Sequence, residues 1–396
     1  MKALPLLLAA LLAAAALLGC DGSPPFPGPD DDDDVAPPMA DCDPSIGATA
    51  PLPVCSSDNP CLAPSPTDDR DLIEAASDAP LCATSDADRP PFDDGPPRQW
   101  TDPDGVLRSS CLYVPDGAGP DAPRPLVVFL HGAFGSADNV YDATSLRSKA
   151  SDFDLSGEPS RPGFVLLSVQ GRNLHWPTAD PRDGAHHDNF HRDLAVPSGN
   201  PDVANLDRLI DELVAGGAVD PSRIFVTGWS NGGFFAQLYA IARHEVATPG
   251  GNHVAAAAVF SAADPFHGAR HGEEPSCRLD PYPTSEVPVF VVGRACDLVA
   301  CDADQAAGLE ADGVPVAPGF VAETWLDDLA GRVGDPNAER RIVNGFGVEV
   351  DSCTGPALCG PAIATLSHVR WPDGVADGSG VDHEADMLRF LAESPL

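Results

Sequence analysis

Basic side chains are scarce in this chain of 396 residues. Lysine and arginine together number 23, against 60 aspartates and glutamates, which gives a formal net charge of -37 at pH 7. A molecule with that charge repels nucleic acid and anionic lipid head groups, so we exclude both as partners. An acidic surface suits neutral or cationic substrates better than polyanions.

A Cys-x-x-Cys pair is also absent, although the chain has 11 cysteines. Structural zinc sites commonly use such pairs, so their absence argues against zinc. Without Cys20, which is considered next, the cysteines form an even set of ten. An even set in an exported protein indicates disulfides, whose pairing the spacing leaves open.

No apolar run is long enough to cross a bilayer, which takes about 20 residues. The one candidate, residues 3–18, follows Lys2 and is followed by Gly19-Cys20. These features predict a secretory signal peptide over residues 1–19. The ending is typical of a bacterial lipobox, so we expect a lipid on Cys20 as the only membrane attachment, on the periplasmic or extracellular side. An ordinary signal peptide with an incidental cysteine is the alternative.

Two segments without a clear hydrophobic pattern follow. Residues 20–41 are rich in Pro, Gly and Asp and predict a disordered tether, because they cannot bury enough apolar surface to fold. Residues 42–97 are rich in Cys and Pro, with a single helix expected near residues 69–77. We interpret them as a disulfide-stabilised appendage lying on the main domain, and a separate binding module is the alternative.

Residues 98–396 alternate between strand and helix patterns, which predicts an α/β fold with a mostly parallel sheet and helices on both faces. Ligands of such sheets bind at the C-terminal ends of the strands. We expect a helix with Asn200 as its N-cap and a final helix with Asp382 as its N-cap. Strands are expected at residues 106–114 (an edge strand), 125–130, 164–169, 224–226, 254–261, 287–292 and 362–366, and a further helix at residues 138–150.

The stretch 223–233 carries the strongest chemical signal, a Gly-x-Ser-x-Gly pattern around Ser230. A strand pattern precedes this serine and a helix pattern follows at residues 234–244, so Ser230 lies on a sharp turn, a nucleophile elbow. Glycines flank the serine because a Cβ there would collide with the neighbouring element. In this geometry the backbone N–H of Asn231 points to the oxygen of a substrate carbonyl under attack.

A second oxyanion donor is expected in the loop 131–135, His-Gly-Ala-Phe-Gly, directly after a buried strand. A glycine-rich loop at the C-terminal end of such a strand can present a backbone N–H to the site, and the N–H of Ala133 is the candidate. We expect His131 of this loop, together with Trp229, to contact the substrate.

A catalytic serine needs an acid and a base, which follow it in this chain order. Asp297 comes directly after an expected buried strand and is the predicted acid, whereas Asp302 and Asp304 lie further from the strand end. The neighbouring cysteines, Cys296 and Cys301, would anchor this loop through disulfides.

Two histidines follow the predicted acid in the chain. His368 lies just beyond the strand expected at residues 362–366, at the edge of the sheet where the site belongs, and we favour it as the base. His383, at the start of the final helix, is the alternative because it could also reach the serine.

Four polar residues gather in the segment 172–200, namely His186, His187, Asp188 and His191. Three imidazoles and a carboxylate are adequate metal ligands. Their spacing does not place them on one face of a helix, and the surrounding Gly, Pro and Asp predict a loop. We therefore expect a loop that covers the substrate and no metal or other cofactor, with a metal site as the alternative.

The region from residue 125 to residue 391 resembles the secreted polyhydroxybutyrate depolymerase and feruloyl esterase group of α/β-hydrolases. The resemblance rests on Leu-His-Gly after the first buried strand, on the block 219–233 and on a histidine followed by Trp-Pro at residues 371–372. It implies the α/β-hydrolase fold, ester hydrolysis and His368 as the base. A tryptophan-containing loop of that group implies that Trp176 forms a wall of the substrate site.

Taken together, these features predict a monomeric, exported, lipid-anchored serine esterase. Its triad would be Ser230, His368 and Asp297, and its substrates carboxylic esters of polyester or feruloyl type, without a cofactor. The alternative is a non-catalytic surface lipoprotein that uses the hydrolase scaffold to bind a polymer or glycan, because fold does not determine function.

Overall fold

The computed structural model describes residues 54–55, 73–175, 184–189, 197–263, 265, 278–279, 285–301 and 324–396. Within these ranges no helix combines the length and the apolar character needed to span a bilayer. Some predictions fall outside the described residues and stay predictions: the signal peptide, the tether, and the roles of Cys20, Trp176, His191, Asp302 and Asp304.

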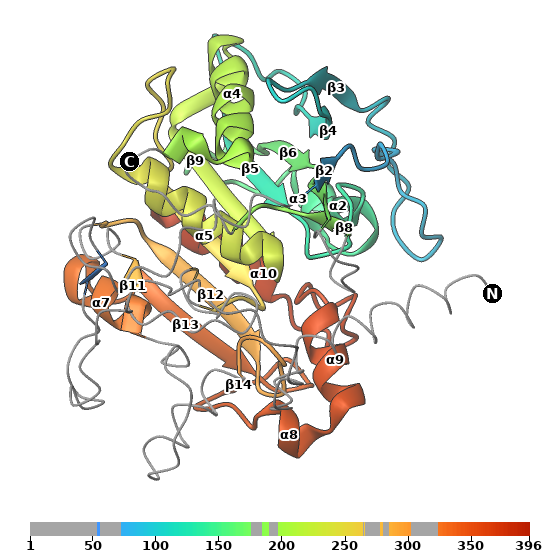
Figure 1. Cartoon of the computed structure of the whole chain (residues 1–396), viewed down its shortest axis with the longest axis vertical. Coiled ribbons are helices and arrows are strands. Elements are labelled where there is room, and N and C mark those ends of the chain that lie inside the picture. Colours follow the sequence, from blue (N-terminus) through green and yellow to red (C-terminus); the bar gives the residue numbers. More distant parts are fainter. Residues whose placement is uncertain are drawn as a thin grey trace, which may run out of the picture.

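A nine-stranded sheet forms the centre of the molecule (Figure 1). Its strands in chain order are β3 (Arg98–Thr101), β4 (Leu107–Tyr113), β5 (Arg124–Leu130), β6 (Val165–Val169), β9 (Val219–Trp229), β10 (Ala256–Phe260), β12 (Val289–Arg294), β13 (Ala338–Val343) and β14 (Glu349–Val350). Their order across the sheet is β14-β13-β12-β10-β9-β5-β6-β4-β3. All neighbours from β6 to β13 run parallel, and β3, β4 and β14 are antiparallel to their neighbours. The sheet is mostly parallel, as predicted, and its order is that of an α/β-hydrolase.

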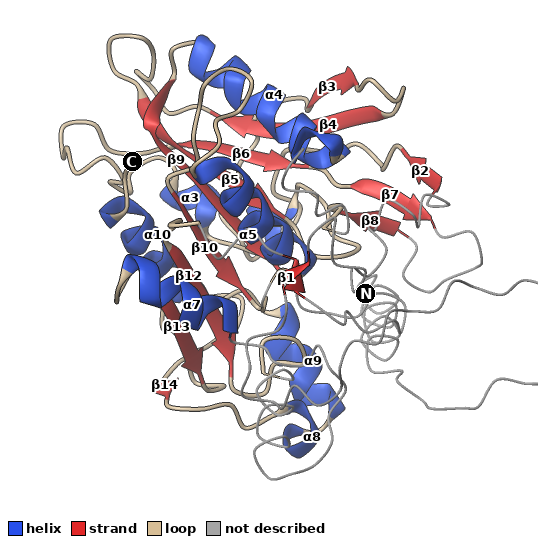
Figure 2. Ribbon diagram, turned by 60° about the vertical axis from the view of Figure 1, so that its left-hand side comes forward, coloured by secondary structure: helices blue, strands red, loops and turns tan. Residues whose placement is uncertain are grey.

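Helices cover both faces of this sheet (Figure 2). The helices are α2 (Asn139–Asp142), α3 (Leu146–Lys149), α4 (Pro201–Ala215), α5 (Asn231–His244), α7 (Thr324–Val333), α8 (Pro356–Cys359), α9 (Pro361–Val369) and α10 (His383–Glu393), with a 3-10 turn at Pro197–Gly199. Alternate residues of β5 divide between the two layers. Leu126, Val128 and Leu130 pack in the core that includes α4 and α5, and Val127 and Phe129 pack with α2, α3 and α10. The central strand is therefore buried on both sides, which explains its unbroken apolar sequence.

Both predicted N-caps are present. The Asn200 side chain accepts hydrogen bonds from the backbone N–H groups of Asp202 (2.8 Å) and Val203 (3.2 Å) at the start of α4. Asp382 accepts from the N–H of Ala385 (2.9 Å) at the start of α10. These side chains satisfy donors that a helix start leaves unpaired, so both boundaries are visible in the sequence.

The prediction of a last strand at residues 362–366 is wrong, because this apolar run lies in helix α9. Pro361 is tolerated at the first helical position, and the buried residues Ala364, Thr365 and His368 follow helical spacing. A short apolar run suits a buried strand or a buried helix until packing decides between them. The last parallel strand is instead β13.

Two further elements differ from their prediction. The strand expected at the edge, β4, lies second in the sheet, because the short strand β3 covers it. The helix expected at residues 138–150 is divided into α2 and α3. Thr144 lies between them, and its hydroxyl donates to the carbonyl of Val140 and accepts from the N–H of Leu146, at 2.9 and 3.2 Å. Such side-chain bonds to the backbone compete with a continuous helix.

The helix expected near residues 69–77 is also wrong in its described part. Ile73–Ala75 is strand β2, which pairs antiparallel with β7 (Arg172–His175), and β7 pairs with β8 (Gly184–His186). The segment 172–200, expected as a loop, therefore contributes two strands. Strands this short carry no period-2 signal, and pairing with distant segments decides their conformation. Two further short strands, β1 (Val54–Cys55) and β11 (Arg278–Leu279), pair in parallel.

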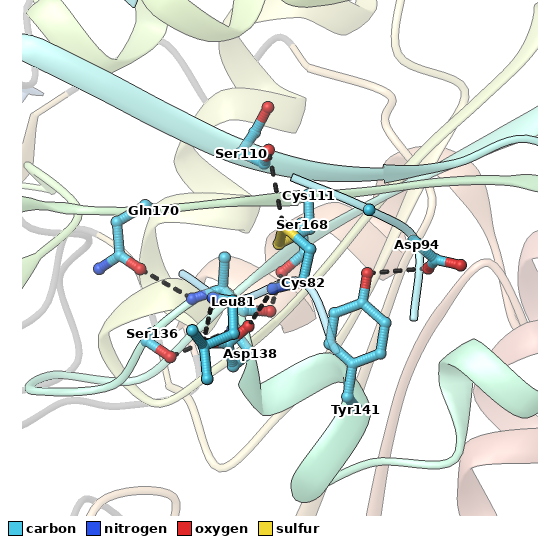
Figure 3. The surroundings of a disulfide bond; sticks show 12 residues. Leu81, Cys82, Asp94, Ser110, Cys111, Ser136, Asp138, Tyr141, Ser168 and Gln170 are labelled. Carbon is cyan, nitrogen blue, oxygen red and sulfur yellow. Dashed lines mark hydrogen bonds between the residues drawn. A yellow bond between two sulfur atoms is a disulfide. The ribbon is translucent and has the colours of Figure 1, made fainter. Parts of the chain in front are cut away.

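Residues 76–97, which belong to the predicted appendage, lie on the main domain. The disulfide Cys82–Cys111 joins them to β4 (Figure 3). The backbone N–H groups of Leu81 and Cys82 donate to the Asp138 carboxylate at 2.9 and 2.8 Å. One disulfide and two hydrogen bonds thus hold this segment beside the sheet.

A buried ion pair fastens the same segment at a second point. Arg89 Nη1 lies 2.7 Å from Asp373 Oδ2, and the two side chains are 6% and 0% exposed. Ser145, between α2 and α3, donates its hydroxyl to the same carboxylate oxygen at 2.7 Å. Asp373 follows helix α9 in the chain, so this ion pair connects the N-terminal segment to the region around His368.

Candidate active site

Ser230 occupies the turn between β9 and α5 with a φ of 54°. This left-handed conformation is uncommon for any residue except glycine. A Cβ on Gly228 would lie 2.2 Å from the carbonyl oxygen of Gly232, and a Cβ on Gly232 would lie 2.2 Å from that of Leu130. Both glycines of the pattern are therefore required by the close approach of β9, α5 and β5. The turn has the strand–turn–helix geometry that the Gly-x-Ser-x-Gly pattern predicts.

The structure brings the predicted acid and base to this serine. His368 Nε2 lies 2.8 Å from Ser230 Oγ, and His368 Nδ1 lies 3.1 Å from Asp297 Oδ1. His383, the alternative base, is occupied elsewhere, with Nε2 at 2.7 Å from the carbonyl oxygen of Gly347. Of the two histidines that the sequence leaves open, only His368 contacts the serine.

Asp297 lies in the loop that follows β12, is fully buried and accepts several hydrogen bonds. Its Oδ1 accepts from the backbone N–H groups of Val299 (2.7 Å) and Ala300 (3.0 Å). Burial by itself would raise the pKa of this carboxyl, but the His368 imidazole and the hydrogen bonds, together, hold the pKa below its ordinary value. The carboxylate is thus charged and held in a fixed orientation toward the imidazole.

Two disulfides anchor the loop that carries this acid. Cys296 pairs with Cys359 and Cys301 pairs with Cys353. The sequence suggests that the two loop cysteines form disulfides, and the structure identifies their partners, which lie just before or within the α8 region. The acid loop and the helix pair that leads to His368 are therefore covalently linked.

Arg294, the last residue of β12, holds the other end of the base-bearing helix. Its buried guanidinium donates to the carbonyl of Ser367 at 3.0 Å and to that of Arg370. It also forms an ion pair with Asp377 at 2.6 Å. A cation at the C-terminus of a helix satisfies carbonyls that lack helical partners and opposes the negative end of the helix dipole. Strand β12 thus supports both the acid and the base.

Trp229, expected to contact the substrate, supports the base through its indole. Its Nε1–H donates to the carbonyl of His368 at 2.8 Å, and its rings meet the buried Trp371 edge-on at 6.3 Å. The indole N–H is therefore committed to the protein rather than to a ligand. Trp229, directly before Ser230, and Trp371, which follows His368 in the chain, therefore belong to one aromatic cluster.

The predicted oxyanion donors lie next to the elbow. A Cβ on Gly132 would lie 3.4 Å from the Cβ of Ser230, so the loop that carries Ala133 passes beside the nucleophile. The backbone N–H groups of Ala133 and Asn231 have no acceptor among the residues that the structure describes. Phe134 follows with a φ of 62°. Two donors without acceptors beside a serine could receive the oxygen of a substrate carbonyl.

The Asn231 side chain binds the backbone of His187 through two hydrogen bonds. Its Oδ1 accepts from the N–H of His187 at 2.8 Å, and its Nδ2 donates to the carbonyl of His187 at 3.0 Å. The residue after the nucleophile thus holds the 184–189 segment beside the site.

The structure corrects the expectation that His131 contacts substrate. This side chain is fully buried, and its Nε2 accepts from the N–H of Gly171 at 2.9 Å while its Nδ1 donates to the carbonyl of Gly132 at 2.7 Å. Burial lowers the pKa of His131 to about 4, so the ring is neutral. His131 shapes the oxyanion loop from behind.

Of the three histidines in the possible metal cluster of the segment 172–200, the structure describes His186 and His187, whereas His191 lies outside the described residues. His187 is buried and stacks on Phe235, and burial lowers its pKa well below the ordinary value. His186 instead packs edge-on against Phe134, with ring centroids 4.8 Å apart. Among the described residues, no group of three or more His, Cys, Asp or Glu side chains could hold a metal ion.

Two residues of the site carry no signal in the sequence. Arg294 is the last residue of the buried strand β12, and Ser261 directly follows the buried strand β10, and neither belongs to a sequence motif. The Ser261 hydroxyl contacts both Asp297 and His368. Contacts between residues this far apart in the chain depend on how β10, β12 and α9 pack, which no local pattern expresses.

No family model matches the chain. Similar solved structures include a thermostable esterase, with 17% identity, a TM-score of 0.38 and coverage of 80% of this chain and 71% of that one. An acetyl xylan esterase from Aspergillus awamori has 16% identity, a TM-score of 0.36 and coverage of 51% and 73%. A butyrate-bound thermophilic esterase from Thermogutta terrifontis has 15% identity, a TM-score of 0.39 and coverage of 76% and 92%.

Proposed function

We propose that this protein is a serine carboxylic-ester hydrolase. The observation that carries the proposal is the hydrogen-bonded series Ser230 Oγ, His368 and Asp297, with contacts of 2.8 and 3.1 Å, on a strained elbow between strand and helix. Such a series activates a hydroxyl that is otherwise a weak nucleophile. A structural serine would require neither the unusual φ nor a buried imidazole and carboxylate in line with it.

In the first half of the reaction Ser230 Oγ attacks the ester carbonyl, and His368 Nε2 takes the serine proton. The negative oxygen of the tetrahedral intermediate is received by the N–H groups of Ala133 and Asn231. His368 then returns its proton to the departing alcohol, which leaves an acyl group on the serine. Water repeats the same steps and releases the carboxylic acid, while Asp297 stabilises the imidazolium each time.

The substrate class that we propose is a neutral ester of polyester or feruloyl type. The resemblance of the 219–233 block to that esterase group supports it, and the acidic charge of the chain disfavours polyanionic substrates. Trp176 is proposed as a wall of the substrate site. We further propose that the enzyme is an exported monomer anchored by a lipid on Cys20, and the three disulfides among the described residues are consistent with an oxidising compartment.

Hydrolysis of p-nitrophenyl butyrate by the purified protein tests the proposal. Ser230→Ala should lower the rate by roughly three or more orders of magnitude, as in other triads. His368→Ala should be similarly inactive, and His383→Ala serves as the matched control that keeps activity. A fluorophosphonate probe should label the wild type and spare Ser230→Ala, because only an activated serine reacts readily.

Turnover retained in Ser230→Ala would refute the mechanism. A folded wild type that is inert and unlabelled would instead favour a non-catalytic protein that binds a polymer or glycan. Parallel assays with a feruloyl ester and a polyhydroxybutyrate film would then rank the substrate classes of an active enzyme.

A further inference from the structure

We propose that Ser261 is a positioning residue of the catalytic site, which holds the Asp297 carboxylate and the His368 imidazole in their reactive arrangement. This inference deepens the esterase function proposed above and rests on it. Ser261 follows β10 directly and is fully buried. Its hydroxyl lies within hydrogen-bond distance of Asp297 Oδ2 and at 2.6 Å from His368 Nδ1.

The hydrogens of these three groups have one satisfactory arrangement. A carboxylate has no proton to donate, so the Ser261 O–H donates to Asp297 Oδ2. The hydroxyl oxygen is then the acceptor for a proton on His368 Nδ1, and Asp297 Oδ1 shares that proton from 3.1 Å. If the hydroxyl donated to the imidazole instead, its oxygen would face the carboxylate oxygen at short distance with no proton between them.

This arrangement selects the tautomer that catalysis needs. With its proton on Nδ1, the imidazole presents an unprotonated Nε2 to Ser230 Oγ at 2.8 Å. That nitrogen can accept the serine proton during attack on an ester. The imidazolium that results keeps both acceptors at Nδ1, and the closer of the two is the hydroxyl of Ser261.

The backbone of Ser261 supports the same role. Its φ of 56° lies in the left-handed region that residues other than glycine rarely adopt. Its N–H donates to the carbonyl of Val292 at 2.8 Å, and the carbonyl of Phe260 accepts from the N–H of Ser230 at 3.1 Å. Phe260 therefore contacts Ser230 through its backbone, and the neighbouring Ser261 contacts His368 and Asp297 through its hydroxyl. Strained backbone of this kind gathers at functional sites, where the surrounding structure holds it.

The first test measures kcat, KM and thermal unfolding of Ser261→Ala with p-nitrophenyl butyrate. Loss of a hydrogen bond to charged groups predicts a fall in kcat of about ten- to a hundredfold with KM nearly unchanged. Ser168→Ala is the matched control, because Ser168 is a buried serine of the same sheet whose hydroxyl donates to the carbonyl of Ala137 at 2.8 Å. The control should keep kcat within about twofold while its stability falls.

A second test asks whether Ser261 acts through the acid and the base. In an Asp297→Asn background the Ser261→Ala change should cost less than about threefold in kcat, because residues that act as a unit are not additive. The same fold-loss in both backgrounds would indicate an independent structural contribution and overturn the inference. Ser261→Gly suits the positive φ and should lose as much kcat as the alanine variant, which separates the hydroxyl from backbone strain.

The outcomes separate this inference from the esterase proposal. Wild-type kcat in both Ser261→Ala and Ser261→Gly would overturn the role of the hydroxyl and leave the esterase function intact. A folded wild type that neither hydrolyses the ester nor reacts with a fluorophosphonate would remove the function and this inference together.

Discussion

Arg294 is the side chain through which β12 holds the end of α9, which carries the proposed base His368, and Arg294→Met tests that role. The guanidinium is buried with Asp377, their side chains being 4% and 6% exposed. Removing one partner of a buried ion pair costs about 3–5 kcal/mol, because the other charge is left uncompensated. The substitution also removes the donor to two backbone carbonyls, those of Ser367 and Arg370, which lie just before and just after His368 in the chain.

The catalytic effect follows from geometry. With its C-terminal carbonyls released, the end of α9 is free to shift, and a misplacement of about 1 Å at a reacting group can lower a rate about a hundredfold. We therefore expect Arg294→Met to lower the free energy of unfolding by about 3–5 kcal/mol and kcat by about ten- to a hundredfold. Urea unfolding at pH 7 and kcat for p-nitrophenyl butyrate give the two values.

Asp377→Asn is the matched control for this experiment. It removes the ion pair but leaves the guanidinium bonded to the helix carbonyls, so stability should fall while kcat stays within about twofold of the wild type. Two results would refute the reasoning: a wild-type kcat in Arg294→Met, or a loss of kcat in Asp377→Asn as large as that in Arg294→Met.

Burial raises the pKa of Glu384 to about 7, so the folded protein binds this proton more tightly than the unfolded chain, and its stability should fall as pH rises from about 4.5 to about 7. Glu384→Gln should remove that part of the slope, which urea unfolding at pH 5 and pH 7.5 would detect; an unchanged slope would contradict it. Replacing Cys296 and Cys359 with serine should lower stability by about 2–5 kcal/mol and also lower kcat, whereas the same change at Cys82 and Cys111 should affect stability alone. Equal kcat losses in the two double variants would contradict the second prediction.

The elements that the sequence predicts well are those whose cause is local. The elbow around Ser230 depends on glycines within two residues of it, and the caps of α4 and α10 depend on one side chain and the N–H groups that follow. The parallel strands 125–130 and 164–169 are buried on both faces, so their apolar runs are unbroken. In each case the physical requirement and the signal occupy the same short stretch of chain.

His368 shows where local reasoning ends. The strand expected just before it is helix α9, yet the histidine still reaches the C-terminal edge of the sheet, because the end of α9 is held against β12. The hydroxyl of Ser261 and the guanidinium of Arg294 matter only through partners that lie 36 to 107 residues away in the chain, so a single sequence cannot distinguish them from ordinary residues at strand ends. Likewise, the hydrogen bond from the Trp229 indole to the carbonyl of His368 joins residues 139 apart in the chain, which no local pattern expresses.

The Arg89–Asp373 ion pair has a consequence for how the protein can be shortened. A chain trimmed at residue 98, where the hydrolase pattern begins, would leave Asp373 buried without its cation and Cys111 as an unpaired thiol. Such a truncation should give a poorly folding, oxidation-prone product, whereas one that begins ahead of Cys82 keeps both fastenings. In recombinant work or in a gene fusion, residues 76–97 should therefore be kept with the main domain, and replacing them with an unrelated module should destabilise the proposed hydrolase.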